Sequence, residues 1–300
     1  MDVRTALKQA IAQLRDACVP SFTLAAELLL LHVLGRNRTW LYAHPEASLS
    51  ESEAQQFAGL LARRAAGEPT QHLTGRQEFW GLEFEVTPDV LIPRPETEHV
   101  IEVALDRLAV REIRAGRKQR LTGEGLLLAD IGTGSGCIAI GLATDLPAAR
   151  LIATDISLPA LAVAQRNAQR HSVADRIRFV EANLLQGFED LMTGNPSRGF
   201  DLIVSNPPYI GHKERDTLMR EVRDHEPELA LYGGEEGFEL YADLIAQSAR
   251  ALNGGGLLVI ELGHNSLPAV QPLLNAPHWT NIGATNDLAG IPRVVAAQRT

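Results

Sequence analysis

The fold of this chain is decided by residues 126–138, which read LLLADIGTGSGCI. The apolar run 126–131 has the length and composition of a buried strand, and closely spaced glycines follow it at once. Glycines let backbone N–H groups approach a ligand closely, and a helix expected from Ile138 adds its positive end. The third glycine comes one position too early for the dinucleotide pattern Gly-x-Gly-x-x-Gly. A smaller charged group, such as an amino-acid carboxylate, therefore fits this loop better than a pyrophosphate.

Strand-like and helix-like segments alternate from residue 125 to the end of the sequence. This alternation predicts an α/β domain built on a doubly wound, mostly parallel sheet. An antiparallel pairing is one option for the last two expected strands. The expected strands are 126–131, 151–155, 177–181, 201–204, 257–261, 281–285 and 292–297, and helices are expected at 138–144, 159–171 and 239–252.

Polar residues stand at the ends of the second and third expected strands. Asp155 ends the second strand, where a carboxylate is placed to accept both hydroxyls of a ribose. The alternative is that Asp155 caps the helix that follows. Asn183 and Leu184 follow the third strand, where we expect them beside an adenine. Carboxyl ends of parallel strands share one edge of a sheet, so these residues and the glycine loop are expected together.

The fourth expected strand runs into Asn206, Pro207, Pro208 and Tyr209. Two consecutive prolines end a strand ladder and hold Asn206 extended. The result is a stiff tip that presents one carboxamide, free backbone carbonyls and one ring. Such a tip suits a planar group that carries N–H bonds, although the same residues also make an ordinary turn.

The first part of the chain reads differently. Residues 1–74 show apolar positions at helical spacing, and Ser50 with Glu53 forms the pattern of a capping box. We expect a small helical bundle here, which serves either as a scaffold or as a docking surface for a macromolecular substrate. Residues 75–92 predict a β-hairpin or extended linker. The remaining residues, 93–300, form the expected α/β domain.

Composition narrows the classes of function. The chain has 300 residues, a net charge of −9 and two cysteines. The acidic balance argues against a general nucleic-acid binder, which needs clustered Lys and Arg. Neither the cysteines nor the histidines have metal-ligand spacing, so no metal site is expected. No apolar stretch approaches the roughly 20 residues of a membrane span. We therefore expect a cytoplasmic protein without a membrane partner or direct nucleic-acid contact.

The order of glycine loop, acidic strand tip and Asn-Pro-Pro-Tyr resembles the class I methyltransferases that use S-adenosylmethionine. Further motifs resemble the HemK/PrmC family, whose members methylate the side-chain nitrogen (N5) of the glutamine in the Gly-Gly-Gln motif of peptide chain release factors. The similarity covers nearly the whole chain. It is carried by Gly67-Glu68-Pro69, Leu73-Thr74-Gly75, Glu78-Phe79-Trp80-Gly81-Leu82, residues 91–98 (LIPRPETE), Glu226-Pro227, Leu231-Tyr232-Gly233-Gly234, Glu261-Leu262-Gly263 and Asp287-Leu288-Ala289-Gly290.

The resemblance implies a Rossmann-like methyltransferase domain with an N-terminal helical domain, S-adenosylmethionine as cofactor and a release factor as protein substrate. It assigns the methionine end of the cofactor to Gly132, Thr133, Gly134, Ser135 and Gly136, the ribose to Asp155, and the adenine to Asn183 and Leu184. Asn206 would touch both cofactor and substrate. The substrate slot would be lined by Pro207, Pro208 and Tyr209, with Asn206, Pro207 and Tyr209 as the catalytic set.

Two departures from the family pattern affect this assignment. Relatives often carry Asp, or Asp-Trp, where this chain has Asn183 and Leu184, which loosens the adenine assignment. Glu236-Gly237 stands where relatives tend to have Asp-Gly. Other interpretations remain: a glutamine methyltransferase of a ribosomal protein, an adenine-N6 methyltransferase of nucleic acid, a dehydrogenase, or a non-catalytic adaptor.

Overall fold

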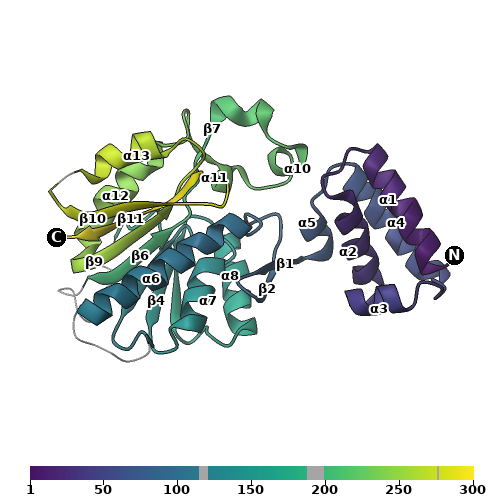
Figure 1. Cartoon of the computed structure of the whole chain (residues 1–300), viewed down its shortest axis with the longest axis horizontal. Coiled ribbons are helices and arrows are strands. Elements are labelled where there is room, and N and C mark those ends of the chain that lie inside the picture. Colours follow the sequence, from purple (N-terminus) through teal and green to yellow (C-terminus); the bar gives the residue numbers. More distant parts are fainter. Residues whose placement is uncertain (115–120, 188–198, 276) are drawn as a thin grey trace. The chain divides into compact units, whose positions relative to one another are not determined.

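The computed structural model describes residues 1–114, 121–187, 199–275 and 277–300. Its contacts group the chain into two compact units (Figure 1). The first contains Met1–Arg76 and Leu218–Glu226, and the second contains Gln77–Thr217 and Pro227–Thr300. The segment Leu218–Glu226 therefore belongs with the N-terminal helices by its contacts, although it lies far along the sequence.

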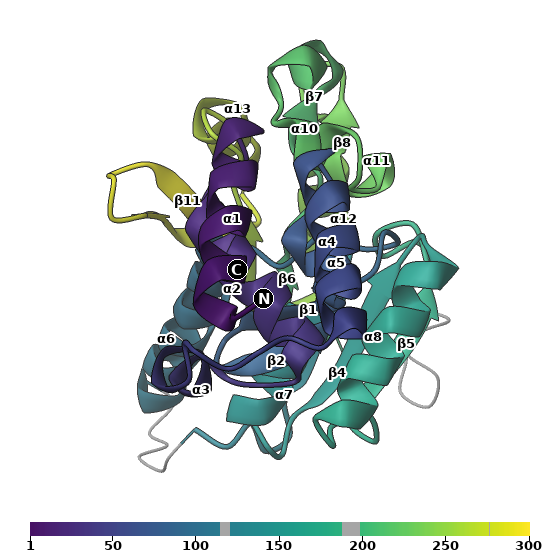
Figure 2. The same ribbon diagram turned by 90° about the vertical axis from the view of Figure 1, so that its right-hand side faces the viewer.

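The first unit is helical, as predicted. Its helices are α1 (Val3–Asp16), α2 (Phe22–Leu34), α3 (Arg38–Ala43), α4 (Glu51–Ala65), α5 (Thr70–Thr74) and α10 (Arg220–Arg223). Helices α1, α2 and α4 lie side by side (Figure 2) and bury an apolar core that includes Leu14, Leu29 and Phe57. The capping box at the start of α4 is confirmed, since Ser50 Oγ accepts from the Glu53 N–H at 3.2 Å and Glu53 Oε2 accepts from the Ser50 N–H at 2.7 Å.

The expected hairpin is present. Strands β1 (Arg76–Phe79) and β2 (Leu82–Glu85) pair through a two-residue loop, in which Trp80 and Gly81 both have positive φ, 55° and 68°. Positive φ at both central residues is typical of a type I′ turn, whose twist matches that of the two strands it joins. The hairpin packs on α8 (Leu158–Arg170), where Asn167 Oδ1 accepts from the Glu85 N–H at 2.7 Å.

The second unit is built on a seven-stranded sheet in the order β10-β11-β9-β6-β3-β4-β5. Neighbours from β9 to β5 are parallel, whereas β11 pairs antiparallel with both β9 and β10. The doubly wound sheet and its antiparallel final pair are thus confirmed. The strands are β3 (Leu127–Ile131), β4 (Arg150–Asp155), β5 (Ile177–Glu181), β6 (Phe200–Ser205), β9 (Leu252–Glu261), β10 (Trp279–Asn286) and β11 (Pro292–Arg299).

Strand β9 begins five residues earlier than the apolar pattern predicts. Its first half contains consecutive glycines, of which Gly255 has a φ of 79°, and the register with β6 shifts there. Glycine has no side chain, so a glycine-rich segment lacks the apolar residues that mark a strand in a sequence. This half of β9 could therefore not be recognised as a strand.

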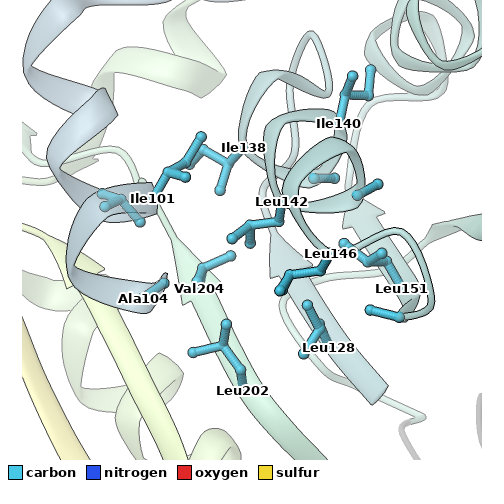
Figure 3. Close-up of a cluster of buried hydrophobic side chains, with 14 of the residues drawn as sticks. Ile101, Ala104, Leu128, Ile138, Ile140, Leu142, Leu146, Leu151, Leu202 and Val204 are labelled. Carbon is cyan, nitrogen blue, oxygen red and sulfur yellow. The ribbon is translucent and has the colours of Figure 1, made fainter. Parts of the chain in front are cut away.

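Helices cover both faces of the sheet. Helices α6 (Glu98–Arg114), α7 (Cys137–Asp145) and α8 pack on one face, and α12 (Glu239–Ala251) and α13 (Leu267–Leu274) on the other. Successive strand residues alternate between the two cores, so that Leu128 joins α7 while Ala129 joins α12. Figure 3 shows the first core, where Ile101 of α6 and Leu142 of α7 meet Val204 of β6.

Short elements complete the second unit. They are η1 (Pro95–Thr97), η2 (His212–Thr217), α11 (Glu228–Leu231) and the parallel pair β7 (Ile210–Gly211) and β8 (Tyr232–Gly234). Within the described ranges, the structure contains no helix with the length and apolar character needed to cross a membrane.

Candidate active site

A cavity of about 570 Å³ opens at the carboxyl ends of the central parallel strands. Its size falls within the roughly 300–1,000 Å³ typical of ligand pockets. The chain order reverses between β3 and β6, which lie side by side, and such switch points are where open α/β sheets bind ligands. The predicted site residues in its lining are Gly132, Thr133, Gly134, Ser135, Asp155, Asn183, Leu184, Asn206 and Pro208.

The glycine loop takes its shape from left-handed backbone at Gly132, Gly134 and Gly136, with φ of 71°, 54° and 84°. A Cβ added to Gly132 or Gly134 would meet no heavy atom within 4 Å, so open space lies beside the loop. Gly136 differs, because its Cβ would lie 3.1 Å from the Cβ of Ala164. Gly136 is absent from the cavity lining, and its lack of a side chain lets α7 approach α8.

Asp130, which was not among the predicted site residues, holds this loop through hydrogen bonds. Its Oδ2 accepts hydrogen bonds from the Thr133 hydroxyl at 2.6 Å and the Ala139 N–H at 3.1 Å. Complete burial raises the pKa of Asp130 to about 7, against the lowering effect of those hydrogen bonds. The sequence did carry a signal for this role, since Asp130 is the one acidic residue in an otherwise apolar strand. Burying a carboxyl group is costly unless it forms hydrogen bonds, so a buried acid indicates a structural or functional contact.

Asp155 ties two strand tips together. Its Oδ2 accepts from the Gly134 N–H at 2.8 Å and its Oδ1 from the Ser157 N–H at 2.9 Å. Burial raises its pKa, although backbone hydrogen bonds act in the opposite direction. The N-cap of α8 is Ser157, whose Oγ accepts from the Ala160 N–H at 3.2 Å. The capping interpretation of Asp155 is therefore wrong, and its carboxylate faces the cavity beside the glycine loop.

Asn183 and Leu184 form the edge of the cavity beyond β5. Leu184 has a φ of 55°, and its carbonyl accepts from the Thr154 hydroxyl at 3.0 Å. An apolar side chain and an amide therefore line the same cavity as Asp155.

Asn206 lies one residue beyond β6. The strand tip is fixed to β3, because the Ser205 hydroxyl donates to the Ile131 carbonyl at 2.7 Å. The Asn206 Nδ2 donates to Thr97 Oγ1 at 3.1 Å, and its Oδ1 accepts from no described residue. The carboxamide thus has its nitrogen occupied and its oxygen available to the cavity.

Pro207 and Tyr209 lie outside the cavity lining, which differs from the prediction that both line the substrate slot. Pro207 is buried. The Tyr209 hydroxyl donates to Glu261 Oε1 at 3.1 Å, and its ring lies so near Gly263 that a Cβ there would be 2.8 Å away. Tyr209 therefore anchors the tip to β9, a contact that is set by strand order and not by local sequence.

Comparison with known proteins identifies the family. The description "PrmC N-terminal domain" matches residues 5–75, and "Methyltransferase small domain" matches residues 119–235. A release factor glutamine methyltransferase of Koribacter versatilis is 42% identical over 299 residues, covering 100% of this chain and 99% of the relative. A protein of the same name from Bradyrhizobium diazoefficiens is 41% identical over 299 residues, covering 99% of this chain and 95% of the relative.

The chain belongs to the release factor glutamine methyltransferase family. A solved structure of the hMettl16 catalytic domain in complex with the MAT2A 3'UTR hairpin 6 has the same fold, with a TM-score of 0.52 at 18% identity over 79% of this chain and 81% of that one. As a member of the release factor glutamine methyltransferase family, the protein is an S-adenosylmethionine-dependent enzyme with a class I methyltransferase fold.

The residues of the cavity fit S-adenosylmethionine. Open space lies beside Gly132 and Gly134, where a charged group could approach the backbone. The Asp155 carboxylate can accept hydrogen bonds from hydroxyl groups, and Ile156 and Leu184 add apolar surface to the same cavity.

Proposed function

We propose that this chain transfers a methyl group from S-adenosylmethionine to the side-chain nitrogen of the glutamine in the Gly-Gly-Gln motif of peptide chain release factors. The observation that carries the proposal is the Asn206 carboxamide at the cavity, with its nitrogen bonded to Thr97 and its oxygen without a partner among the residues that the structure describes. An unpaired amide oxygen is suited to the N–H group of another amide. Relatives with 41–42% identity over nearly the whole chain carry the corresponding name, which supports the substrate class.

Residues of the glycine loop from Gly132 to Gly136 would hold the methionine end of the cofactor, and Asp155 its ribose. Asn183 and Leu184 would contact the adenine. When bound, S-adenosylmethionine supplies a methyl group on a positively charged sulfur, which is already a good leaving group.

The protein's own residues would activate the glutamine side-chain nitrogen, which is a poor nucleophile. The lone pair of a glutamine side-chain nitrogen is delocalised into its carbonyl group. Acceptance of an N–H bond by Asn206 Oδ1 would fix the nitrogen in line with the methyl group and raise its electron density. The Pro207 carbonyl, expected as the second acceptor, belongs to a buried residue outside the cavity lining. Positioning of this kind supplies effective molarities of up to roughly 10⁵ M or more. Acceptors held where positive charge develops add electrostatic stabilisation.

Pro208 would form one wall of the substrate slot, since it lines the cavity. Tyr209 would act without touching the substrate, because its hydrogen bond to Glu261 holds the Asn-Pro-Pro-Tyr segment rigid. We further propose that residues 1–74 dock the release factor, that residues 75–92 link the two parts, and that residues 93–300 carry the transferase activity. We also propose a cytoplasmic location, which a protein substrate of the translation apparatus supports.

Mass spectrometry of a purified release factor after incubation with enzyme and cofactor tests the proposal. We expect the mass of one added methylene, localised to the glutamine of Gly-Gly-Gln. A release factor with glutamate at that position is the matched substrate control and should gain nothing. Asn206→Ala should retain measurable cofactor affinity while turnover is lost. Methylation of a ribosomal protein or a nucleic acid, with the release factor untouched, would refute the proposal.

A further inference from the structure

The carboxamide of Asn206 can present either of two groups to the cavity, because its oxygen and its NH₂ have similar shapes. The proposed function requires the oxygen there. In the structure, Nδ2 donates to Thr97 Oγ1 at 3.1 Å. The Thr97 hydroxyl has a single proton, so it accepts from Nδ2 only while that proton points elsewhere. The orientation of Asn206 therefore depends on what accepts the Thr97 proton.

Glu261 stands where such an acceptor is needed. It ends β9, the neighbour of β6, one residue beyond the paired Ser205 and Ile260. Its Oε1 accepts from the Tyr209 hydroxyl at 3.1 Å, whereas its buried Oε2 meets no described donor in good hydrogen-bond geometry. The Thr97 hydroxyl is the neighbour whose hydrogen bonding lowers the pKa of Glu261 most. Thr97 and Glu261 are only 2% and 1% exposed, so bulk water cannot replace either partner.

We propose that Glu261 is a positioning residue, which accepts the Thr97 hydroxyl proton and thereby holds Asn206 with Oδ1 toward the cavity. The proposal rests on the proposed function, since it concerns how the same carboxamide grips the substrate amide. Without an ionised acceptor at Glu261, the Thr97 hydroxyl would be free to donate to Asn206 Oδ1. The NH₂ would then face the N–H groups of the substrate, and two donors cannot bond to each other.

The surroundings of Glu261 hold it rigidly for this role. The Tyr241 hydroxyl donates to the Glu261 carbonyl at 3.0 Å and accepts from the Gly263 N–H at 3.2 Å, which fixes the end of β9. Tyr209 occupies Oε1 and so leaves Oε2 for Thr97. The proposal therefore assigns the Thr97 hydroxyl proton to Oε2, the carboxylate oxygen that has no hydrogen-bond partner among the described residues.

The arrangement also predicts a pH dependence. Burial raises the pKa of Glu261 to about 7, the strongest of several influences. Below that pH the carboxyl carries a proton and becomes a donor, which releases the Thr97 hydroxyl toward Asn206. Turnover should therefore rise as the pH increases through about 7. The titratable and charged groups that act on Glu261, or that it acts on, are Tyr209, Arg293, Glu96, Tyr241 and Cys137.

Two variants of Thr97 test the relay. Thr97→Val removes the hydroxyl, and we expect kcat to fall roughly ten- to hundredfold, the range seen when outer partners of metal-site ligands are removed. Thr97→Ser keeps the hydroxyl and should restore most of the activity. Ser248→Ala is the matched control, because Ser248 is a buried hydroxyl on α12 without a hydrogen-bond partner among the described residues. Cofactor affinity, measured calorimetrically, should be unchanged in Thr97→Val. The thermal unfolding temperature should fall, because Asn206 Nδ2 loses the acceptor that the buried Thr97 hydroxyl provides.

Glu261→Gln completes the experiment. We expect kcat to fall and the inflection near pH 7 in the pH profile to disappear. The double variant with Thr97→Val should have the same kcat as the slower of the two single variants, because both changes break the same relay. Additive losses, an unchanged pH profile in Glu261→Gln, or full kcat in Thr97→Val would overturn the proposal. Failure of the wild-type enzyme to methylate a release factor would instead refute the proposed function, so the two failures are distinguishable.

Discussion

Replacing Asp155 tests the cofactor site most directly. The carboxylate accepts from the Gly134 N–H at 2.8 Å and the Ser157 N–H at 2.9 Å while it lines the cavity. A hydrogen bond to a charged group contributes about 1.5–3 kcal/mol. At about 1.4 kcal/mol per factor of ten, loss of the ribose contact in Asp155→Ala should weaken S-adenosylmethionine binding by roughly tenfold to more than a hundredfold. The freed Gly134 loop should move the result toward the upper end of this range.

Isothermal titration calorimetry with S-adenosylmethionine measures the change, because it needs no release factor. Asp155→Asn keeps the size of the side chain but only one acceptor oxygen, and we expect an intermediate loss. Asp243→Ala is the control, since Asp243 is an exposed carboxylate of the same unit, on α12 and outside the cavity. A dissociation constant for Asp155→Ala within twofold of the wild-type value would refute the assignment of Asp155 to the ribose.

Three further changes have defined outcomes. In Gly263→Ala the new Cβ would lie 2.8 Å from the Tyr209 ring, so we expect kcat to fall and the free energy of unfolding to decrease by about 1–3 kcal/mol. An unchanged kcat would show that the position of the Tyr209 ring does not matter for activity. Leu128→Ala, in a fully buried position, should cost about 2–5 kcal/mol in urea unfolding, and a cost below 1 kcal/mol would contradict the packing seen in Figure 3. Burial raises the folded-state pKa of Asp130 to about 7, so the charged carboxylate destabilises the fold progressively as the pH rises from about 4 to 7. Without cofactor, Asp130→Asn should therefore gain stability relative to wild type between pH 5 and pH 8, by about 4 kcal/mol at most, and a pH-independent difference would exclude a buried titration.

Much of the site followed from local sequence. The positions of Gly134, Asp155, Asn183 and Asn206 at the ends of strands were predictable, because each stands where an apolar run stops. Parallel strands bring such ends to one edge of a sheet, so their convergence on one cavity was predictable as well. Pro207 and Tyr209 were placed in the slot by the same reasoning, which describes where the backbone leads but not which way each side chain turns.

The sequence by itself determined the alternation of strands and helices, the glycine loop and the stiff Asn-Pro-Pro-Tyr tip, since these depend on residue spacing and on the stereochemistry of glycine and proline. Only the tertiary structure decided that β9 lies beside β6, and therefore that Glu261 meets Tyr209, a residue 52 positions away in the chain. Thr97 and Asn206 are 109 positions apart, and no periodic pattern records their contact. Hydrogen bonding and burial act over a few ångströms of space, so the partner of each polar group and the raised pKa of Glu261 exist only once the sheet has brought distant segments together.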